Sequence, residues 1–239
     1  MTITDGPLRA DALTLAYGHQ PVLTGLSLRF ADSEATAITG PSGSGKTSLL
    51  YCLSGLERPD SGTVTLLGHD LADLSADQLA DLRLRHVGFV FQSADLVPEL
   101  TLRQNIALPL QLARRPRREV TARVDELIAL LGITESADRR PSQVSGGQAQ
   151  RCAVGRAVAA RPAVVFADEP TGALDRAHRD VVLDLLLHQV AEIGSLLVTV
   201  THDPDVADRF DRQIVLTDGT VSTDRRRQAD GTAREEARG

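Results

Sequence analysis

Residues 40–47 have the types and spacing of a phosphate-binding loop that fits the pattern GxxxxGK[ST]. They are Gly40, Pro41, Ser42, Gly43, Ser44, Gly45, Lys46 and Thr47, and Ser48 follows them. In such a loop the backbone N–H groups turn toward a phosphate, and the helix that follows directs its positive end at the same charge. Lys46, the only lysine in the chain, would contact the β- and γ-phosphates, and the Thr47 hydroxyl would bind Mg²⁺. The alternative is a glycine-rich turn that has this spacing by accident.

Asp168 and Glu169 follow directly after the apolar run at residues 163–167. A carboxylate at the carboxyl end of a buried parallel strand points into the ligand crevice of an open α/β sheet. We therefore expect Asp168 to hold Mg²⁺ through water, and Glu169 to orient or deprotonate a water that attacks the γ-phosphate. Taken alone, the pair is equally compatible with a solvated acidic loop after a core strand.

Ser145, Gly146, Gly147 and Gln148 precede a helical pattern. Here Ser145 would cap the helix, the glycines would permit close approach of another backbone, and the helix dipole would favour an anion. This predicts a second phosphate-binding helix terminus. In isolation, the simpler interpretation of a capped helix after a glycine turn is preferred.

The elements that must position these residues follow from hydrophobic periodicity. A strand runs into the loop at Gly40 and a helix leaves it. Residues 92–161 contain helical patterns without strands, which indicates a mostly helical insertion. Strands are predicted at residues 12–16, 26–30, 35–39, 63–67, 86–91, 163–167, 196–200, 213–217 and 220–223, and helices at 47–56, 71–84, 120–131, 148–160 and 177–193.

Composition narrows the class of protein. The 239 residues carry 26 Lys plus Arg against 32 Asp plus Glu, a net charge of −6, with 3% aromatic residues and no Trp. These values argue against general affinity for nucleic acid, which needs excess cations and stacking aromatics. No apolar run approaches the ~18 residues that cross a bilayer, and residues 1–10 do not resemble a secretion signal. Cys52 and Cys152 are too few for a disulfide scaffold. We expect a soluble intracellular protein.

Together the motifs resemble the nucleotide-binding subunit of an ABC transporter, and residues 145–148 match its SGGQ signature. The resemblance extends from Leu8 to Asp224. It implies that Tyr17 stacks on adenine, that Gln92 senses Mg²⁺ and the attacking water, and that His202 contacts the γ-phosphate. Asp175 is similar to the D-loop aspartate at the dimer interface. Each of these residues has an ordinary structural interpretation when taken alone.

The resemblance also implies an architecture. We expect an α/β P-loop NTPase (RecA-like) core with an antiparallel β subdomain and an α-helical subdomain that carries the signature. A single ABC domain would span residues 1–224, with its core at 1–92 and 162–224 and its helical subdomain at 93–161. Residues 225–239 would be a charged, mobile tail.

A mechanism and partners are implied in the same way. Two copies would enclose two MgATP molecules head to tail, so that the loop at Gly40 faces the signature of the other chain. Closure would require ATP, and hydrolysis would reopen the dimer. The catalytic residues would be Glu169, His202 and Lys46, with Thr47, Gln92 and Asp168 at the Mg²⁺ ion. No nucleic-acid partner is expected.

Residues 56–68, 74–92, 96–101 and 169–175 are similar to the lipoprotein-release, macrolide-export and cell-division group of ABC ATPases. This similarity implies a membrane permease that contacts the region after Gln92, and therefore a location at the cytoplasmic face of the membrane. One alternative is the ATPase of a signalling complex that controls a cell-wall enzyme without transport. A soluble ATPase acting on DNA or ribosomes is less favoured. The arginines at 114–118 and 225–227 are interpreted as solvated surface, with anionic lipid as the alternative partner.

Overall fold

The structure is a computed structural model that describes residues 6–227 and 233–235. The chain forms two compact units. The first unit combines Met1–Ala80 with Leu196–Gly239, and the second unit is Asp81–Ser195. Helix α2 (Ala76–His86) crosses the boundary between them. These units divide the chain differently from the expected boundaries at residues 92 and 161.

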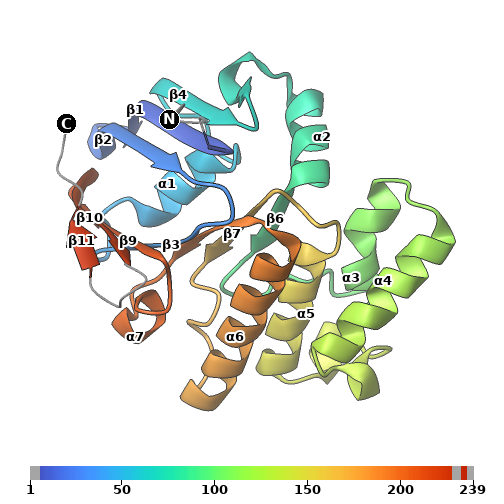
Figure 1. Ribbon diagram of the computed structural model, residues 1–239. Coiled ribbons are helices and arrows are strands. Elements are labelled where there is room, and N and C mark those ends of the chain that lie inside the picture. The colour runs from blue at the N-terminus through green and yellow to red at the C-terminus, as the bar shows by residue number, and fades with distance from the viewer. Residues whose placement is uncertain (1–5, 228–232, 236–239) are drawn as a thin grey trace. The chain divides into compact units, whose positions relative to one another are not determined.

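The first unit contains two groups of strands with a helix between them (Figure 1). The antiparallel group has the order β2-β1-β4-β5. In the other group β3 pairs in parallel with β8 and β9, and β10 pairs antiparallel with β9 and β11. Helix α1 packs against β8 on one side and against β1, β2 and β4 on the other. The bounds are β1 Leu8–Tyr17, β2 Gln20–Phe30, β3 Ala35–Thr39, α1 Lys46–Leu53, β4 Ser61–Leu66, β5 His69–Asp70, η1 Leu71–Asp73, β8 Leu196–Val200, α7 Pro204–Ala207, β9 Arg212–Thr217, β10 Thr220–Arg227 and β11 Ala233–Glu235.

Burial explains why these strands form where they do. Along β1 the residues alternate between buried and more exposed positions, with Leu8, Ala10 and Leu13 fully buried, as expected for a strand with one covered face. All five residues of β8 are buried, because a parallel strand is covered on both faces.

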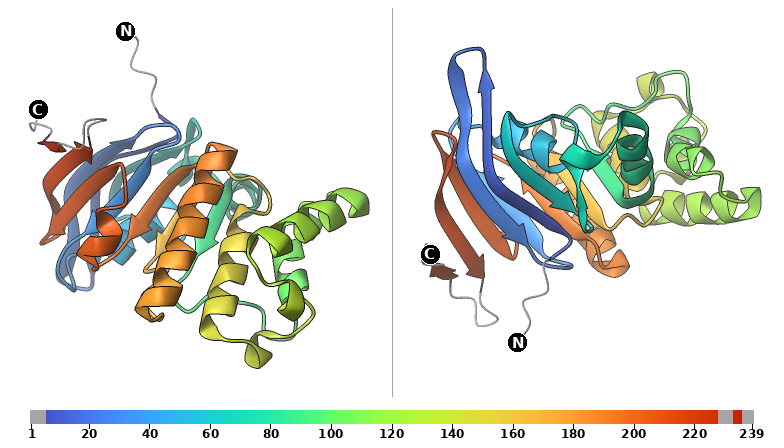
Figure 2. Two further views of the ribbon diagram at one scale, coloured as in Figure 1. Left: turned by 60° about the horizontal axis from the view of Figure 1, so that its bottom comes forward. Right: turned by 90° about the horizontal axis from the view of Figure 1, so that it is seen from above.

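The second unit consists of two parallel strands and several helices (Figure 2). Helix α5 packs against α3, α4, α6 and β6. The bounds are β6 Val87–Val90, α3 Leu102–Leu112, α4 Arg117–Leu130, η2 Thr134–Ser136, η3 Pro141–Gln143, α5 Gly146–Val158, β7 Val164–Asp168 and α6 Arg176–Ile193. The exposed arginines at 114–118 lie where α3 ends and α4 begins. None of the helices among the described residues is long and apolar enough to cross a membrane.

Two local predictions differ from the structure. The helix expected at residues 71–84 is divided, because the Asp70 side chain caps the short helix η1 and Ser75 forms a separate cap with Gln78 ahead of α2. Helix α3 was not predicted, because Pro109 lies inside it. Its N-cap is Thr101, which forms a capping box with Gln104.

The expected tail does not begin at residue 225, because β10 continues through Arg227. Asp224 within this strand binds the buried Arg212, whose Nε and Nη2 donate to the two carboxylate oxygens at 2.7 and 2.5 Å. Arg212 Nη1 also donates to the Arg29 carbonyl and to Glu34. The Arg212 side chain is only 3% exposed. A cation buried in this way holds β10 against the rest of the first unit. Residues 228–232 and 236–239 of the expected tail lie outside the described residues.

Replacing Arg212 with Met should lower the free energy of unfolding by about 3–5 kcal/mol, because Asp224 loses its buried counter-charge and Glu34 loses one of its two arginine partners. Urea unfolding followed by circular dichroism measures this change. The matched control is Arg85→Met, since Arg85 and Asp81 form an ion pair on α2 that is more than half exposed and should contribute no more than about 0.5 kcal/mol. Equal effects of the two substitutions would contradict a structural role for the buried network.

Candidate functional site

The loop between β3 and α1 has the backbone of a phosphate cradle. Gly40 has φ +142° and Gly45 has φ +95°, both in the region that favours glycine. A Cβ atom on Gly40 would lie 2.1 Å from the Leu216 carbonyl oxygen, and one on Gly45 would lie 2.6 Å from the Val22 carbonyl oxygen. Both positions therefore require glycine. Gly45 is also the N-cap of α1 and makes no side-chain cap hydrogen bond, as expected for a helix start that an anion would complete.

The tip of the loop consists of Ser42 and Gly43, which are both exposed. The Ser44 N–H donates to the Pro41 carbonyl oxygen at 3.3 Å and so closes a turn around these two residues. Nothing lies within 4 Å of the position that a Cβ on Gly43 would occupy, in contrast to the crowded Gly40 and Gly45. A ligand can therefore approach the tip from solvent. The predicted contacts of Ser42 and Gly43 with a nucleotide stay predictions.

The polar groups of this loop fit a bound phosphate. Lys46 Nζ donates to the carbonyl oxygens of Gly40 and Pro41 at 3.0 and 2.9 Å, so the ammonium group lies across the loop. The buried Ser44 hydroxyl has no hydrogen-bond partner in the structure. Leaving a buried hydroxyl unpaired costs free energy. A cation over the loop and an unpaired hydroxyl within it suit an anionic ligand.

Tyr17 lies at the end of β1, beside the start of α1. Its hydroxyl is 3.2 Å from Ser48 Oγ and donates to Glu57 Oε2 at 2.7 Å, while the residue is 53% exposed. The hydrogen bond to Glu57 raises the pKa of the Tyr17 phenol, and the bond to Ser48 opposes this shift. The structure therefore brings two predicted residues, Tyr17 and Ser48, together. Sequence reasoning missed Glu57, which lies 40 residues from Tyr17.

His202 is placed by the parallel pairing of β3 with β8. Ile38 pairs with Val200, and the Thr201 N–H donates to the Ile38 carbonyl oxygen at 3.1 Å. Gly40 and His202 consequently follow their strands at the same edge. Asp203, the next residue, caps α7 through its side chain. The first unit thus holds Tyr17, the phosphate-binding loop and His202.

In the second unit, β6 and β7 place Gln92 and the acidic pair at one edge. Val90 pairs in parallel with Ala167, so Gln92 and Glu169 follow at corresponding positions, and Asp168 is the last residue of β7. Gln92 and Glu169 meet around Gly172, where an added Cβ would lie 3.2 Å from Gln92 Nε2 and 3.5 Å from Glu169 Cβ. Glu169 has φ +46°, a strained backbone conformation for a residue with a side chain, of the kind that collects at functional sites.

The signature and the D-loop are in contact within the second unit. Ser145 caps α5, with its Oγ accepting from the Gln148 N–H at 3.2 Å, and Gln148 Oε1 accepts from the Ser145 N–H at 3.0 Å. Asp175 caps α6 and its carboxylate lies 2.7 Å from His178 Nδ1. A Cβ on Gly147 would lie 2.9 Å from His178 Cδ2. His178, which sequence reasoning missed, therefore lies between the two motifs.

Two further side chains of α5 hold the segment that follows β6. Gln150 Nε2 donates to the Phe91 carbonyl oxygen at 3.0 Å. Arg156 donates to the carbonyl oxygens of Asp95 and Ala94 at 2.7 and 3.0 Å, and its burial lowers the pKa of its guanidinium group. The helix that begins at the signature therefore also fixes the backbone on both sides of Gln92. Neither residue was predicted.

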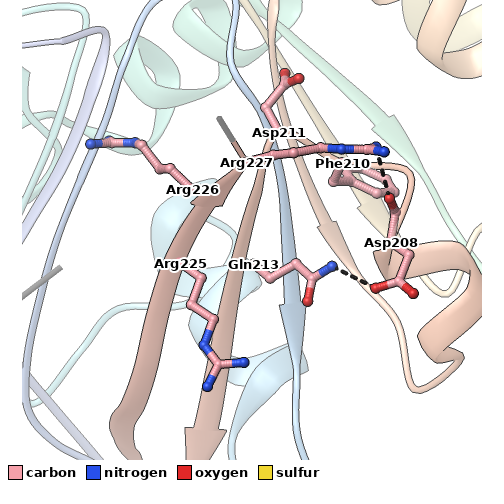
Figure 3. A pocket seen from close by; sticks show the side chains of 7 residues that line it. All are labelled: Asp208, Phe210, Asp211, Gln213, Arg225, Arg226 and Arg227. Carbon is pink, nitrogen blue, oxygen red and sulfur yellow. Dashed lines mark hydrogen bonds between the residues drawn. The ribbon is translucent and has the colours of Figure 1, made fainter. Parts of the chain in front are cut away.

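A cavity of about 330 Å³ lies against the last strands of the first unit (Figure 3). Its described lining contains none of the predicted site residues. Arg227 Nη1 donates to the Asp208 carbonyl oxygen at 3.2 Å, and Gln213 donates to the Asp208 carboxylate at 2.9 Å. Arg226 points to the other side, where it pairs with Glu34. Two of the three arginines at 225–227 are therefore fastened within the first unit.

Comparison with known proteins shows similarity along most of the chain. Residues 23–172 match the family model described as ABC transporter. The chain is 43% identical to lipoprotein-releasing system ATP-binding protein LolD 2 of Caulobacter vibrioides, over 87% of this chain and 91% of the relative. It is 42% identical to methionine import ATP-binding protein MetN of Brucella abortus, over 86% of this chain and 56% of that longer protein.

A solved structure has the same fold. It is the dimeric ATP-binding cassette MJ0796 in a post-hydrolysis state, bound to ADP and Pi. It is 34% identical, with a TM-score of 0.85, and the match covers 93% of this chain and 99% of that one. The fold is accordingly that of a P-loop NTPase, as predicted.

The backbone of Glu169 provides a test that does not depend on activity. Glycine tolerates a positive φ, whereas a residue with a Cβ is destabilised there by about 1 kcal/mol. A Glu169→Gly variant should therefore be more stable than Glu169→Ala by about 1 kcal/mol, as measured by chemical denaturation. At Glu99, whose φ is not positive, the stability order should be reversed, with Glu99→Ala more stable than Glu99→Gly. Greater stability of Glu169→Ala would show that the strained conformation is absent in solution.

Proposed function

The chain belongs to the ABC transporter family, and from that premise we propose which part each residue has in ATP binding and hydrolysis. As a member of that family it is an ATP-binding subunit with ATP hydrolase activity. The observation that carries the proposal is the uncapped start of α1, where Lys46 lies across the loop and Ser44 is unpaired. The triphosphate of ATP supplies the charge and the acceptors that these groups need.

Mg²⁺ fits the predicted donor set. The set consists of the Thr47 hydroxyl, the Gln92 amide oxygen and the Asp168 carboxylate, which are the oxygen ligands that a Mg²⁺ ion with several waters prefers. When bound, Mg²⁺ neutralises charge on the β- and γ-phosphates. Lys46 binds the same phosphates, while residues 40–45, including the exposed Ser42 and Gly43, surround them with backbone N–H groups. Tyr17 stacks on the base.

Glu169 is proposed to orient the attacking water and to accept its proton. His202 is proposed to contact the γ-phosphate and so to distinguish ATP from ADP. Support for both roles comes from their positions after parallel strands, at the edge where α/β folds bind ligands. For Glu169 the strained backbone is further support, because such strain persists only where the surroundings enforce it.

The active form is proposed to be a head-to-tail homodimer that closes on ATP. Residues Ser145, Gly146, Gly147 and Gln148 would then act on the nucleotide of the partner chain, with Asp175 at the interface. Two observations favour this arrangement. The related cassette MJ0796 is a dimer bound to ADP and Pi, and the signature and D-loop of this chain pack on each other through His178.

The membrane partner is proposed to be a permease of the lipoprotein-release or export type, which holds the chain at the cytoplasmic face of the membrane. Overall identity does not separate release from import, because the LolD and MetN relatives are 43% and 42% identical. The similarity of residues 56–68, 74–92, 96–101 and 169–175 to the release and export group favours the first. The permease would contact the segment after Gln92. A signalling complex that controls a cell-wall enzyme remains the second candidate, because the same ATPase cycle serves both.

Replacing Glu169 with Gln should reduce ATP turnover by at least about 100-fold, because the amide cannot accept the proton of the attacking water. ATP binding should persist, so the variant should accumulate as an ATP-bound dimer. Phosphate release and size-exclusion chromatography with ATP measure the two effects. Turnover at the wild-type rate would remove Glu169 from its proposed role.

Mixed dimers test the action of the signature on the partner chain. A Ser145→Arg chain should still bind ATP in its own loop but should fail to support hydrolysis at the partner's nucleotide. If dimers with one Ser145→Arg chain hydrolyse at both sites as the wild type does, the head-to-tail arrangement is wrong.

Purification of the chain from native membranes in mild detergent tests the partner. Mass spectrometry should identify a permease with few membrane spans and a large extracytoplasmic domain. A permease with many spans would instead support import or a conventional exporter, and recovery of a cell-wall enzyme would support the signalling complex. Recovery of ribosomal proteins without any permease would overturn the membrane function.

A further inference from the structure

Tyr17 is an exposed aromatic residue whose hydroxyl is nevertheless bound at two points. Glu57 Oε2 accepts its hydrogen bond at 2.7 Å, and Ser48 Oγ lies 3.2 Å away. Ser48 belongs to the first turn of α1, whereas Glu57 follows the end of that helix. The phenol is thus held over α1 by one group from each end of it.

The segment that carries Glu57 is itself fixed. The N–H groups of Leu56 and Glu57 both donate to the Tyr51 carbonyl oxygen, at 2.9 and 3.1 Å. Three residues later, Asp60 Oδ2 accepts from the Ala16 N–H at 2.7 Å, and the Asp60 N–H donates to the Thr14 carbonyl oxygen at 2.8 Å. The segment is therefore attached to α1 at one end and to β1, next to Tyr17, at the other.

This arrangement determines where the Tyr17 ring lies. The residue is 53% exposed, so packing alone does not select one rotamer. A ring that must be ordered when a base stacks on it loses side-chain entropy at that moment, and prior ordering reduces the loss. The hydrogen bond to Glu57 is also the largest cause of the raised pKa of the Tyr17 phenol, as expected when the protonated hydroxyl donates to a carboxylate.

We propose that Glu57 is a positioning residue for nucleotide binding, whose carboxylate holds the Tyr17 ring in the orientation that stacks on the base. This inference rests on the proposed function, because it takes Tyr17 as the base-stacking residue. It assigns Glu57 no contact with the phosphates. The predicted consequence is a loss of affinity that depends on the presence of the base.

The experiment compares two ligands by isothermal titration calorimetry on the full chain. The first is the non-hydrolysable ATP analogue AMPPNP, and the second is inorganic tripolyphosphate, which lacks a base. Tyr17→Ala should weaken AMPPNP binding by about 10-fold, the order expected for one stacked base. Glu57→Ala should weaken it by about 3- to 5-fold, since the ring remains but is no longer ordered. Neither substitution should change the affinity for tripolyphosphate.

Conservative variants separate positioning from a general structural effect. Glu57→Gln keeps an oxygen that accepts from the Tyr17 hydroxyl, so it should restore most of the AMPPNP affinity. In a Tyr17→Phe background, Glu57→Ala should cause no further loss, because the hydrogen bond is already absent. Asp73→Ala, which removes an exposed carboxylate elsewhere in the first unit, controls for the change in charge.

Each adverse outcome has a distinct meaning. If Tyr17→Ala weakens AMPPNP binding and Glu57→Ala does not, the positioning role is wrong and the proposed function stands. Equal loss of AMPPNP and tripolyphosphate affinity in Glu57→Ala would also overturn positioning, since it indicates damage to α1 and its loop. If Tyr17→Ala binds AMPPNP as the wild type does, Tyr17 is not the stacking residue and the inference fails with that assignment.

Discussion

Parallel pairing of buried strands decides which side chains of this protein can meet. In the first unit β3 and β8 end together, so the phosphate-binding loop and His202 emerge at one edge. In the second unit β6 and β7 end together, so Gln92 and Glu169 do the same and meet around Gly172. An antiparallel pairing would send the corresponding residues to opposite edges. The continuous burial of β8 and of most of β7 therefore serves the site as well as the core.

The sequence predicted those parts of the site whose residues are contiguous in the chain or directly follow a recognisable strand. The loop at residues 40–47 is a contiguous pattern, and the short apolar runs before His202 and Asp168 identify the strand ends. Two of the residues that sequence reasoning missed act through distant contacts. Glu57 meets Tyr17 across 40 residues, and Arg156 reaches the backbone of Asp95 across 61. Nothing in the residues beside Glu57 or Arg156 indicates those partners, because tertiary packing alone brings them together.

The same distinction explains the errors in the fold. Helix α3 contains a proline, which a local pattern treats as a break, yet the capping box at Thr101 and the buried Asn105, whose amide bonds the backbone of residues 97–101, fix its start. Arg225 and its neighbours have the composition of a tail, and β10 nevertheless includes them. Its continuation depends on the ion pair between Asp224 and the buried Arg212, a contact that composition does not reveal.

The two helices that begin at glycine-rich loops differ in a way that matches their proposed tasks. Helix α1 begins after Gly45, which makes no side-chain cap hydrogen bond, and a bound phosphate would complete this helix start. Helix α5 has its own capping box, in which Ser145 and Gln148 satisfy each other's N–H groups. The first turn of such a helix has its N–H groups hydrogen-bonded by its own residues, so it needs no ligand to be stable. That property suits the proposed signature, which would meet nucleotide only when a partner chain presents it, whereas α1 would bind nucleotide within its own chain.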